Sequence, residues 1–556
     1  MSSPPLVSAL DARTQMFPAL TEAQIERIRS CGRLRPVHAG EILFEPGDTD
    51  IPFYVLLSGS MEILQPDHDG DHAIVSHSPG HFTGELTMIS GHRCLVRGRV
   101  TSDGEFLELS APDLRALVGR DAELSDILMR AFILRRLELI RRGLGNLILM
   151  GSRHSAATLH LRDFLSRVGH PYRYVDLDTD TISQELLDQF KVSVDEIPVV
   201  ICQRRGVMRN PTIPALADCL GLNSNIDHRQ VRDVIIVGAG PAGLAAAVYA
   251  ASEGLDALLV EAGAPGGQAS SSSKIENYLG FPMGISGQEL AARATAQAEK
   301  FGAQMMVAHK VVRLDCGTRP YQLELDNGTR LAARAIVIST GAQYNKPKIS
   351  NLQQFEGQGV YYGATFMESQ LCEGQDVVVV GGGNSAGQAA VYLSQTVRKV
   401  YMLVRSSGLA DSMSRYLIQR IEQNPAIELH YSTELTAVAG NGALQRVTWR
   451  NSVSGESSER EICHVFIMAG ASPRTALVQG CLALDSKGFI LTGRDLESNG
   501  SGPAWAHSRP PLLLETSVPG VFAVGDVRSG NVKRVAAAVG EGSIAIHLVH
   551  RALAEP

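Results

Sequence analysis

The stretch Arg232-Asp-Val-Ile-Ile-Val-Gly238-Ala-Gly240-Pro-Ala-Gly243 joins a β-branched run to a glycine-rich turn, and an alanine-rich stretch follows. A second stretch of the same kind reads Asp376-Val-Val-Val-Val-Gly381-Gly-Gly383-Asn384-Ser385-Ala386. Strand, glycine turn and helix in this order form a dinucleotide fingerprint, because glycines let the backbone approach a pyrophosphate at a helix N-terminus. Two such stretches predict two Rossmann-like α/β domains and two dinucleotides.

The residue that ends the next strand of each unit indicates which dinucleotide is bound. After the first turn the run Ala257-Leu-Leu-Val ends at Glu261, whose carboxylate suits ribose hydroxyls and repels a 2′-phosphate. After the second turn the corresponding run ends at Arg405, followed by Ser406 and Ser407, and these residues suit a 2′-phosphate. The sequence therefore predicts FAD at the first site and NADPH at the second, with NADH as the alternative.

Four further motifs accompany the first fingerprint. They are Gly266-Gly267-Gln268, Ile275-Glu-Asn277-Tyr278, Ile338-Ser-Thr340-Gly341 and Val521-Phe-Ala-Val-Gly525-Asp526. With these motifs the chain resembles the thioredoxin reductase family of flavoproteins over residues 233–556. The resemblance implies that the four segments lie along FAD, that Asp526 binds the ribityl chain, and that Arg534 and Val535 begin a helix at the flavin. It also implies a homodimer.

The same resemblance assigns the second fingerprint to the nicotinamide cofactor. Its turn and first helical residues would hold the pyrophosphate, and they are Gly381, Gly383, Asn384, Ser385 and Ala386. The family has two adjacent arginines and a third a few residues on. In this chain Arg405 matches directly, and Arg415 is the candidate for the third.

The redox dithiol of that family is missing. Thioredoxin reductases carry Cys-x-x-Cys just before the second fingerprint, where this chain has Gly363-Ala-Thr-Phe366. Dithiol exchange needs an attacking thiolate and a resolving thiol, so conventional thioredoxin reduction is not expected. Phe366 either shields the flavin or fills space. Cys372 either acts alone or packs as a small apolar residue.

Residues 16–142 alternate short apolar runs with glycine turns, which predicts a small antiparallel barrel followed by an amphipathic helix. The segment Phe82-Thr-Gly84-Glu85-Leu resembles the phosphate-binding cassette of cyclic-nucleotide-binding domains. That resemblance implies that Glu85 binds a ribose hydroxyl and that an arginine, Arg93 or alternatively Arg97, binds the cyclic phosphate. A barrel with only a structural or interaction role is the other interpretation.

Residues 146–222 predict strand, helix, strand and a third strand that follows Ile197-Pro198. This order resembles a thioredoxin- or glutaredoxin-like fold, in which the proline is cis. The dithiol of that fold would follow the first strand, where the chain has Ser152-Arg-His154-Ser155. A docking or scaffold role is therefore expected, with Ser155 as a helix cap.

These patterns predict a multidomain fold with an N-terminal all-β barrel and flanking helices, an α/β thioredoxin-like domain, and two Rossmann-like domains. The expected divisions are a cyclic-nucleotide-binding-like domain at 16–142, a thioredoxin-like domain without CxxC at 146–222, an FAD-binding domain at 229–350 and 470–556, and an NAD(P)H-binding domain at 356–469.

Composition narrows the function further. The net charge of −7 argues against a broad basic surface for nucleic acid. Eight cysteines without CxxC favour reduced thiols in a cytoplasmic protein, and no metal-ligand cluster stands out. The sequence shows neither a secretory signal nor an apolar run near the length of about 18 residues that a membrane span needs.

The sequence thus predicts an FAD-dependent NAD(P)H oxidoreductase that passes hydride from NADPH to flavin and then to an unidentified acceptor. Electron transfer to a ferredoxin-like carrier, as in ferredoxin–NADP reductases, is one alternative. A second is a flavin and nicotinamide redox sensor with little turnover, and a third is a reductase gated by a cyclic nucleotide.

Overall fold

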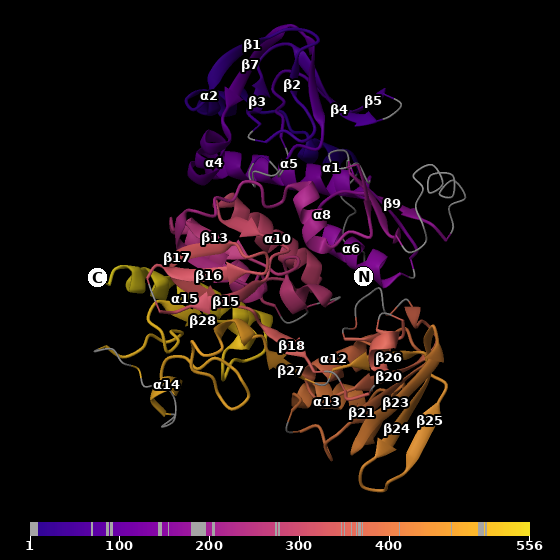
Figure 1. The fold of residues 1–556 in the computed structure, drawn as a ribbon. Coiled ribbons are helices and arrows are strands. Elements are labelled where there is room, and N and C mark those ends of the chain that lie inside the picture. Colours follow the sequence, from indigo (N-terminus) through magenta and orange to yellow (C-terminus); the bar gives the residue numbers. More distant parts are fainter. Residues whose placement is uncertain are drawn as a thin grey trace.

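The computed structural model describes most of the chain between Ala9 and Glu555. Not described are residues 1–8, 50, 68–69, 85–87, 89–92, 143–146, 154, 179–195, 203–205, 273–274, 276–277, 318, 346, 350, 357, 363, 365–368, 370, 411, 469, 499–504, 506–508 and 556. Figure 1 shows a barrel at the top, two α/β layers below it, and a separate sheet at the lower right.

Two antiparallel sheets form the barrel. One has the order β1-β7-β3, with bounds Arg33–Val37, Gly104–Leu109 and Phe53–Leu56. The other has the order β2-β6-β4-β5, with bounds Ile42–Phe44, Arg97–Ser102, Ser60–Asp67 and Gly70–His77. The flanking helices are α1 (Ala9–Met16), α2 (Glu22–Arg29), α4 (Ala111–Arg120) and α5 (Ala122–Arg141). The fully buried rings of Phe53, Phe82 and Phe132 join the sheets to α5. Helix α5 begins at Ala122 because Asp121 caps it, accepting from the Leu124 amide at 3.0 Å.

A four-stranded sheet follows in the order β11-β10-β8-β9, with bounds Gly206–Arg209, Val199–Cys202, Leu147–Gly151 and Arg173–Asp176. Strand β8 runs parallel to β9 and antiparallel to β10. Helices α6 (Ala156–Arg167) and α8 (Ile213–Leu220) accompany this sheet, and Ser155 caps α6 as expected. The Ile197-Pro198 peptide bond before β10 is cis. We call residues 147–222 the intermediate unit.

The first dinucleotide-type sheet has the order β14-β13-β12-β17-β16-β15, and β28 pairs with β17. The bounds are Gln304–Met306, Ala257–Val260, Val231–Val237, Arg330–Ile338, Tyr321–Leu325, Val311–Asp315 and Val521–Ala523. Strands β12, β13, β14, β17 and β28 are parallel and almost wholly apolar, as buried parallel strands are. Helices α9 (Pro241–Ser252), α10 (Gly287–Lys300) and α15 (Val535–Leu553) pack on it.

The second parallel sheet has the order β19-β26-β20-β21-β22, with bounds Val360–Tyr361, His464–Ile467, Asp376–Val380, Lys399–Val404 and Ile427–Tyr431. Helices α12 (Asn384–Leu393) and α13 (Arg415–Glu422) share its core. An antiparallel sheet of β23 (Thr433–Asn441), β24 (Ala443–Asn451) and β25 (Ser457–Arg460) lies beside it. The pair β18 (Ala342–Tyr344) and β27 (Ala471–Pro473) lies between the two parallel sheets, so the chain crosses there twice (Figure 1).

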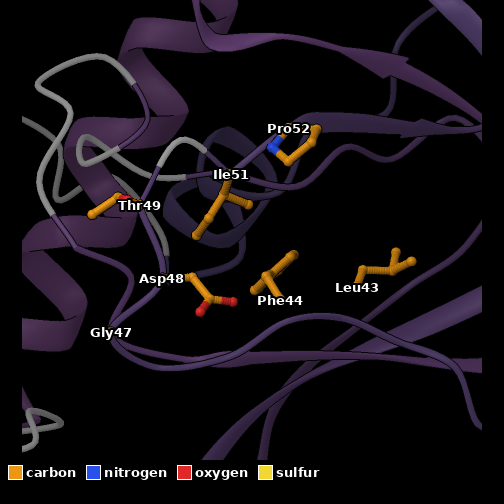
Figure 2. A pocket seen from close by; sticks show the side chains of 7 residues that line it. All are labelled: Leu43, Phe44, Gly47, Asp48, Thr49, Ile51 and Pro52. Atoms are coloured by element: carbon orange, nitrogen blue, oxygen red, sulfur yellow. The ribbon is translucent and has the colours of Figure 1, made fainter.

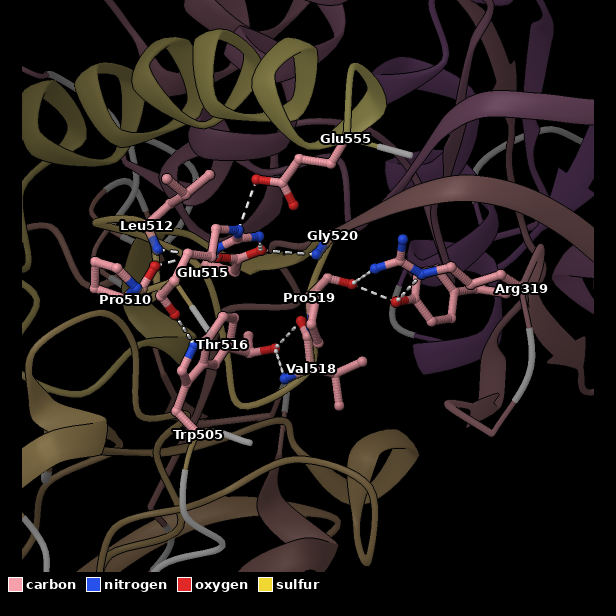
Figure 3. A network of polar contacts seen from close by, with 12 residues as sticks. Arg319, Trp505, Pro510, Leu512, Glu515, Thr516, Val518, Pro519, Gly520 and Glu555 are labelled. Carbon is pink, nitrogen blue, oxygen red and sulfur yellow. Dashed lines mark hydrogen bonds and ion pairs between the residues drawn. The ribbon is translucent and has the colours of Figure 1, made fainter. Parts of the chain in front are cut away.

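A buried ion pair fixes the segment that precedes β28. Glu515 has no exposed surface and accepts two hydrogen bonds from Arg509, at 2.6 and 2.8 Å, and two more from the amides of Leu512 and Gly520. Figure 3 shows that Arg509 also pairs with Glu555 near the chain end. The Tyr321 hydroxyl donates to the Pro519 carbonyl on the other side of the network. The segment 509–520 is thereby tied to both β16 and the region after α15.

The cysteines differ from the expected set of reduced thiols. The structure joins Cys202 to Cys219 and Cys316 to Cys481. Cys372 is fully buried, and its thiol donates to the Ser369 carbonyl at 3.5 Å, which fits the interpretation of Cys372 as a small packing residue.

Across the described ranges, no helix has both the length and the apolar character to span a membrane, and no group of three His, Cys, Asp or Glu side chains is placed to hold a metal ion.

Candidate functional sites

The first glycine turn is too tight for any side chain. Gly238 has φ of +106°, and a Cβ there would lie 2.5 Å from the Ser339 carbonyl oxygen. A Cβ on Gly243 would lie 1.8 Å from the Gly238 oxygen. Gly240 caps α9 without a side-chain hydrogen bond, so the first N–H groups of this helix point into the turn. This is a backbone cradle for an anionic group such as a pyrophosphate.

Glu261 lies where the sequence placed it, directly after β13. Its Oε2 accepts from the Ala239 amide at 2.7 Å, and its Oε1 accepts from the Gly263 amide at 3.0 Å. The carboxylate is thus fixed beside the first glycine turn. Each of its oxygens keeps a lone pair for a ribose hydroxyl.

The pair Gly266-Gly267 packs against the first glycine turn. The Gly266 amide donates to the Ala239 carbonyl at 2.7 Å. Gly267 has φ of +55°, and a Cβ there would lie 2.9 Å from the Cα of Gly240. Gln268 donates its side-chain amide to the Ala342 carbonyl. The structure therefore brings three separate sequence motifs together around Ala239 and Gly240.

The end of β17 supports the same turn. Ser339 donates its hydroxyl toward the Val237 and Gly238 carbonyls, at 2.9 and 2.8 Å. Thr340 donates to the Arg474 carbonyl at 2.8 Å, and the Arg474 amide donates to the Gly341 carbonyl at 3.0 Å. Sequence reasoning selected Thr340 and Gly341 but missed Ser339. A small polar residue directly before the Thr-Gly pair was the signal available.

Gly525 and Asp526 face the start of α9 from β28. A Cβ on Gly525 would lie 3.1 Å from the Cβ of Ala242. The Gly525 amide donates to Glu541 Oε2 at 2.7 Å, and Arg528 pairs with the same carboxylate at 2.5 Å.

Burial raises the pKa of Asp526, with Glu541 adding to this effect and Lys533 opposing it. Arg534 caps α15 and Val535 is its first residue, so this helix N-terminus lies near the same region. Glu541 was missed because it lies inside a helix.

The second fingerprint repeats the first geometry. Gly381 has φ of +143°, and a Cβ there would lie 2.4 Å from the Met468 carbonyl oxygen. Gly383 caps α12 without a side-chain hydrogen bond. Asn384 accepts from the Ser414 amide at 2.8 Å, which ties the helix start to the segment before α13. Ser385 and Ala386 follow in the first turn of α12, with Ala386 buried.

Two arginines lie at the edge of this second turn. Arg405 follows β21 and is exposed, and Arg415 is the exposed first residue of α13. Among the described residues neither guanidinium has a hydrogen bond or ion-pair partner. Asn384 bonds Ser414, the residue before Arg415, and a Cβ on Gly382 would lie 3.8 Å from the hydroxyl of Ser406, the residue after Arg405. Both arginines therefore border the turn that would hold a dinucleotide. They are available for a 2′-phosphate.

The barrel cassette is described only in part. Gly84 has φ of +107° and Glu85 lies outside the described residues. The Nε of Arg93 is buried and lacks a hydrogen-bond partner within the described part of the chain. Its guanidinium lies against Gly221, where an added Cβ would be 2.3 Å from Nε. Arg97 is paired with Glu45 and Asp71, both at 2.8 Å, and Arg93 lies at the C-terminal end of α8, so among the described residues neither guanidinium marks an anion site in the barrel.

A cavity of about 400 Å³ opens beside Gly47 and Asp48 in the barrel (Figure 2). The wall of the cavity is hydrogen-bonded to the segment that follows the cassette. The Gly47 amide donates to the Cys94 carbonyl, and the Cys94 amide donates to the Asp48 carbonyl. Its lining side chains are apolar apart from those of Asp48 and Thr49. The Asp48 carboxylate would repel a phosphate, so this cavity is no argument for a cyclic nucleotide.

Three other residues selected from the sequence fall outside the described residues: Asn277, Gly363 and Phe366. The adjoining Tyr361 is described and stacks on His464, with ring centroids 6.0 Å apart. The roles of Asn277, Gly363 and Phe366 stay predictions from the sequence.

Comparison with known proteins identifies two parts of the chain. Residues 232–542 match the family described as pyridine nucleotide-disulphide oxidoreductase, and residues 34–121 match the cyclic nucleotide-binding domain. The thioredoxin reductase of Bacillus subtilis is 32% identical over 332 residues, which are 59% of this chain and 97% of that protein. The NADPH-dependent thioredoxin reductase 3 of Arabidopsis thaliana is 33% identical over 61% of this chain and 63% of its own length. The crystal structure of Lactococcus lactis thioredoxin reductase matches with a TM-score of 0.52 and 28% identity, covering 58% of this chain and all of that one.

Proposed function

The chain belongs to the pyridine nucleotide-disulphide oxidoreductase family as a relative of thioredoxin reductases, and on this premise we propose that it reduces an acceptor other than thioredoxin. Proteins of the thioredoxin reductase family bind FAD and NADPH and are FAD-dependent NAD(P)H oxidoreductases. The observation that carries the proposal is the stretch Gly363-Ala-Thr-Phe366, which stands where the family has its redox dithiol. The FAD and NADPH sites rest on the two glycine cradles, whose following strands end in opposite charges, Glu261 and Arg405.

Glu261 and the glycine turns are the proposed FAD site. A Cβ on Gly238 or Gly267 would clash with the backbone at 2.5 or 2.9 Å, so glycine is needed to form the cradle that would hold a pyrophosphate. Asp526, with its raised pKa, and the N-terminus of α15 would face the ribityl chain and the flavin. When bound, FAD supplies the hydride acceptor, and the residues named here position it and exclude water.

Arg405 and Arg415 are the proposed discriminators for NADPH. Both guanidinium groups are exposed and lack partners among the described residues, so binding a 2′-phosphate breaks no existing ion pair. Gly381 and Gly383 hold the pyrophosphate in this proposal, and Asn384, Ser385 and Ala386 form the helix start behind it. NADH stays the alternative.

The sequence at 363–366 supports an acceptor other than thioredoxin. Neither Gly363 nor Phe366 can form a thiolate, and the buried Cys372 has no resolving cysteine next to it in the sequence. The acceptor classes that remain are a one-electron carrier of the ferredoxin type, a quinone, oxygen, or a disulfide reached through an external thiol.

The two N-terminal parts are proposed as a ligand-binding barrel and a thioredoxin-like scaffold. The order β11-β10-β8-β9 with a cis-proline before β10 supports the thioredoxin-like assignment of the intermediate unit. The match of residues 34–121 to the cyclic nucleotide-binding domain supports a cyclic nucleotide as the ligand of the barrel. We keep the divisions 16–142, 146–222, 229–350 with 470–556, and 356–469 as proposed domains. A homodimer and a cytoplasmic location also stay proposals.

An anaerobic titration tests the central proposal. The purified full-length protein is titrated with NADPH and separately with NADH, while the visible absorbance of the flavin is followed. We expect NADPH to bleach the flavin at a lower concentration than NADH. We also expect no NADPH-dependent reduction of thioredoxin beyond that of a flavin-free sample. A bound flavin that neither nicotinamide reduces would favour the redox-sensor hypothesis, and rapid thioredoxin reduction would refute the proposed acceptor class.

A further inference from the structure

The last turn of α6 reaches the loop that leads into the Gly266-Gly267 turn. Arg167 Nη2 donates to the Ala264 carbonyl at 2.6 Å and to the Pro265 carbonyl at 3.0 Å, and its Nε donates to Pro265 at 3.1 Å. Only 22% of this side chain is exposed, so the charge-assisted bonds are partly shielded from water. Contacts from a planar guanidinium to two successive carbonyls fix the orientation of both peptide groups.

Those two peptide groups lead directly into the proposed FAD cradle. The next amide, that of Gly266, donates to the Ala239 carbonyl at 2.7 Å. Gly267 then passes so close to Gly240 that a Cβ on Gly267 would lie 2.9 Å from the Gly240 Cα. A displacement of Ala264 and Pro265 would therefore change the spacing between Gly267 and the fingerprint turn.

An apolar core supports the same junction. Leu161, Phe164 and Leu165 of α6 form one buried cluster with Ala264, Val307 and Ala308 of the first dinucleotide-type region. The Ala308 amide donates to the Gly263 carbonyl at 3.0 Å, two residues from Glu261. The intermediate unit is thus packed on the back of the loop that carries Glu261. Densely packed contacts of this kind transmit displacement rather than absorb it.

Two consecutive arginines of α5 join the end of α6 to the barrel. Arg136 of α5 donates to the Gly169 carbonyl at 2.9 Å, two residues after Arg167. The C-terminal carbonyls of a helix attract a cation, because they lack intrahelical donors and carry the negative end of the helix dipole. The neighbouring Arg135 donates to the carbonyls of Gly84 and Phe82, at 2.7 and 3.2 Å. Figure 1 shows α5 running beneath the barrel strands, above α8.

We propose that Arg167 is a positioning residue for the FAD-binding turn, and that Arg135 and Arg136 extend this support to the barrel. The barrel then influences FAD binding through the end of α6, without contact of its own with the cradle. The inference rests on the proposed FAD site, but its test does not require turnover.

Hydrogen exchange and FAD retention test the role of Arg167. Arg167→Gln removes the guanidinium, and Asp163→Asn is the matched control because it removes only the 3.4 Å pair on the exposed side of the same arginine. We expect Arg167→Gln to raise exchange in residues 262–270 about tenfold in the FAD-free protein and to weaken FAD binding about tenfold. The control should match the wild type, and Arg167→Lys, which keeps one donor, should lie between them. Unchanged exchange in Arg167→Gln would overturn the proposal.

Arg136→Gln tests the extension to the barrel, with Arg130→Gln as its control. Arg130 lies on the same helix and pairs with Asp126 on the surface at 3.0 Å. We expect Arg136→Gln to raise exchange in residues 262–270 about threefold, and Arg130→Gln to leave it unchanged. Equal exchange in the two variants would overturn the barrel connection. A wild-type protein that binds no FAD would refute the proposed function, whereas the exchange comparison would still decide this inference.

Discussion

Glu261 and Ala239, 22 residues apart in the chain, are joined by a 2.7 Å hydrogen bond from the Ala239 amide to the Glu261 carboxylate. The bond crosses from the end of β13 to the turn after β12. The hydrogen bond places a negative charge beside the backbone cradle and holds the glycine turn against the end of β13. The acid therefore acts on the cradle itself as well as on a bound ribose.

The first prediction concerns this carboxylate. Glu261→Gln keeps the shape but replaces the charged acceptor, and hydrogen bonds to charged groups contribute about 1.5–3 kcal/mol. We expect the dissociation constant for FAD to rise at least about tenfold, measured by ultrafiltration of the FAD-reconstituted protein. Glu253→Gln is the control, since Glu253 is exposed and pairs with His550 at 3.0 Å. Equal FAD affinity in the two variants would contradict the assignment of Glu261.

The second prediction concerns coenzyme choice. Arg405→Gln removes a charge that has no partner among the described residues, so the variant should lose affinity for the 2′-phosphate without loss of folding. We expect the kcat/KM ratio of NADPH to NADH for flavin reduction to fall about tenfold, with KM for NADH unchanged. Arg415→Gln should have a smaller effect in the same direction.

Arg420→Gln is the control for both arginine variants. Arg420 lies on α13 with Arg415 but donates to the Tyr416 hydroxyl at 2.8 Å. An unchanged NADPH preference in Arg405→Gln would mean that Arg405 does not discriminate between NADPH and NADH. NADH would then be the stronger candidate for the coenzyme of this site.

The third prediction concerns stability around Glu515. Glu515→Gln leaves the Arg509 guanidinium partly buried without its bidentate partner, and breaking a buried pair costs about 3–5 kcal/mol. We expect hydrogen exchange in residues 509–523 to speed up strongly and the urea midpoint of this region to fall. Glu555→Gln, at the more exposed end of the same network, should cost at most about 1 kcal/mol. Similar losses in both variants would mean that burial of Glu515 is not decisive.

The fourth prediction concerns acid lability of the barrel. Burial, together with the smaller effects of the nearby Arg135 and His81, lowers the pKa of His77 to about 3. The folded barrel therefore keeps His77 neutral while the unfolded chain protonates it below about pH 6.5, so stability falls as the pH drops from about 6.5 toward 3. At pH 5 this group alone should cost about 2 kcal/mol relative to pH 7.5.

His77→Phe removes the titration and keeps an aromatic ring beside Phe17. We expect thermal unfolding of the barrel to lose less stability between pH 7.5 and pH 5 in this variant than in the wild type. His72→Gln, at an exposed position of β5, is the control. An identical pH dependence in His77→Phe and the wild type would exclude His77 as the cause.

Much of the local structure follows from sequence patterns. The run Ala257-Leu-Leu-Val is β13, Ser155 caps α6, and both glycine fingerprints are strand, turn and helix as expected. These features depend on residues within a few positions of one another. Periodicity, capping and φ preferences act at that range, so one sequence suffices to predict them.

The sequence by itself determined the two cradles and the charge that ends the strand beside each, because a strand, its turn and the next strand are neighbours in the chain. Only the tertiary structure revealed that Ser339 and Glu541 support the first cradle. It also showed that Arg167 is hydrogen-bonded to the loop that leads into this cradle, and that Cys316 is joined to Cys481. These contacts join residues 97 to 165 positions apart, except that of Glu541, which meets the Gly525 amide across the start of α15. Packing selects such partners from the whole folded chain, and no local pattern specifies them.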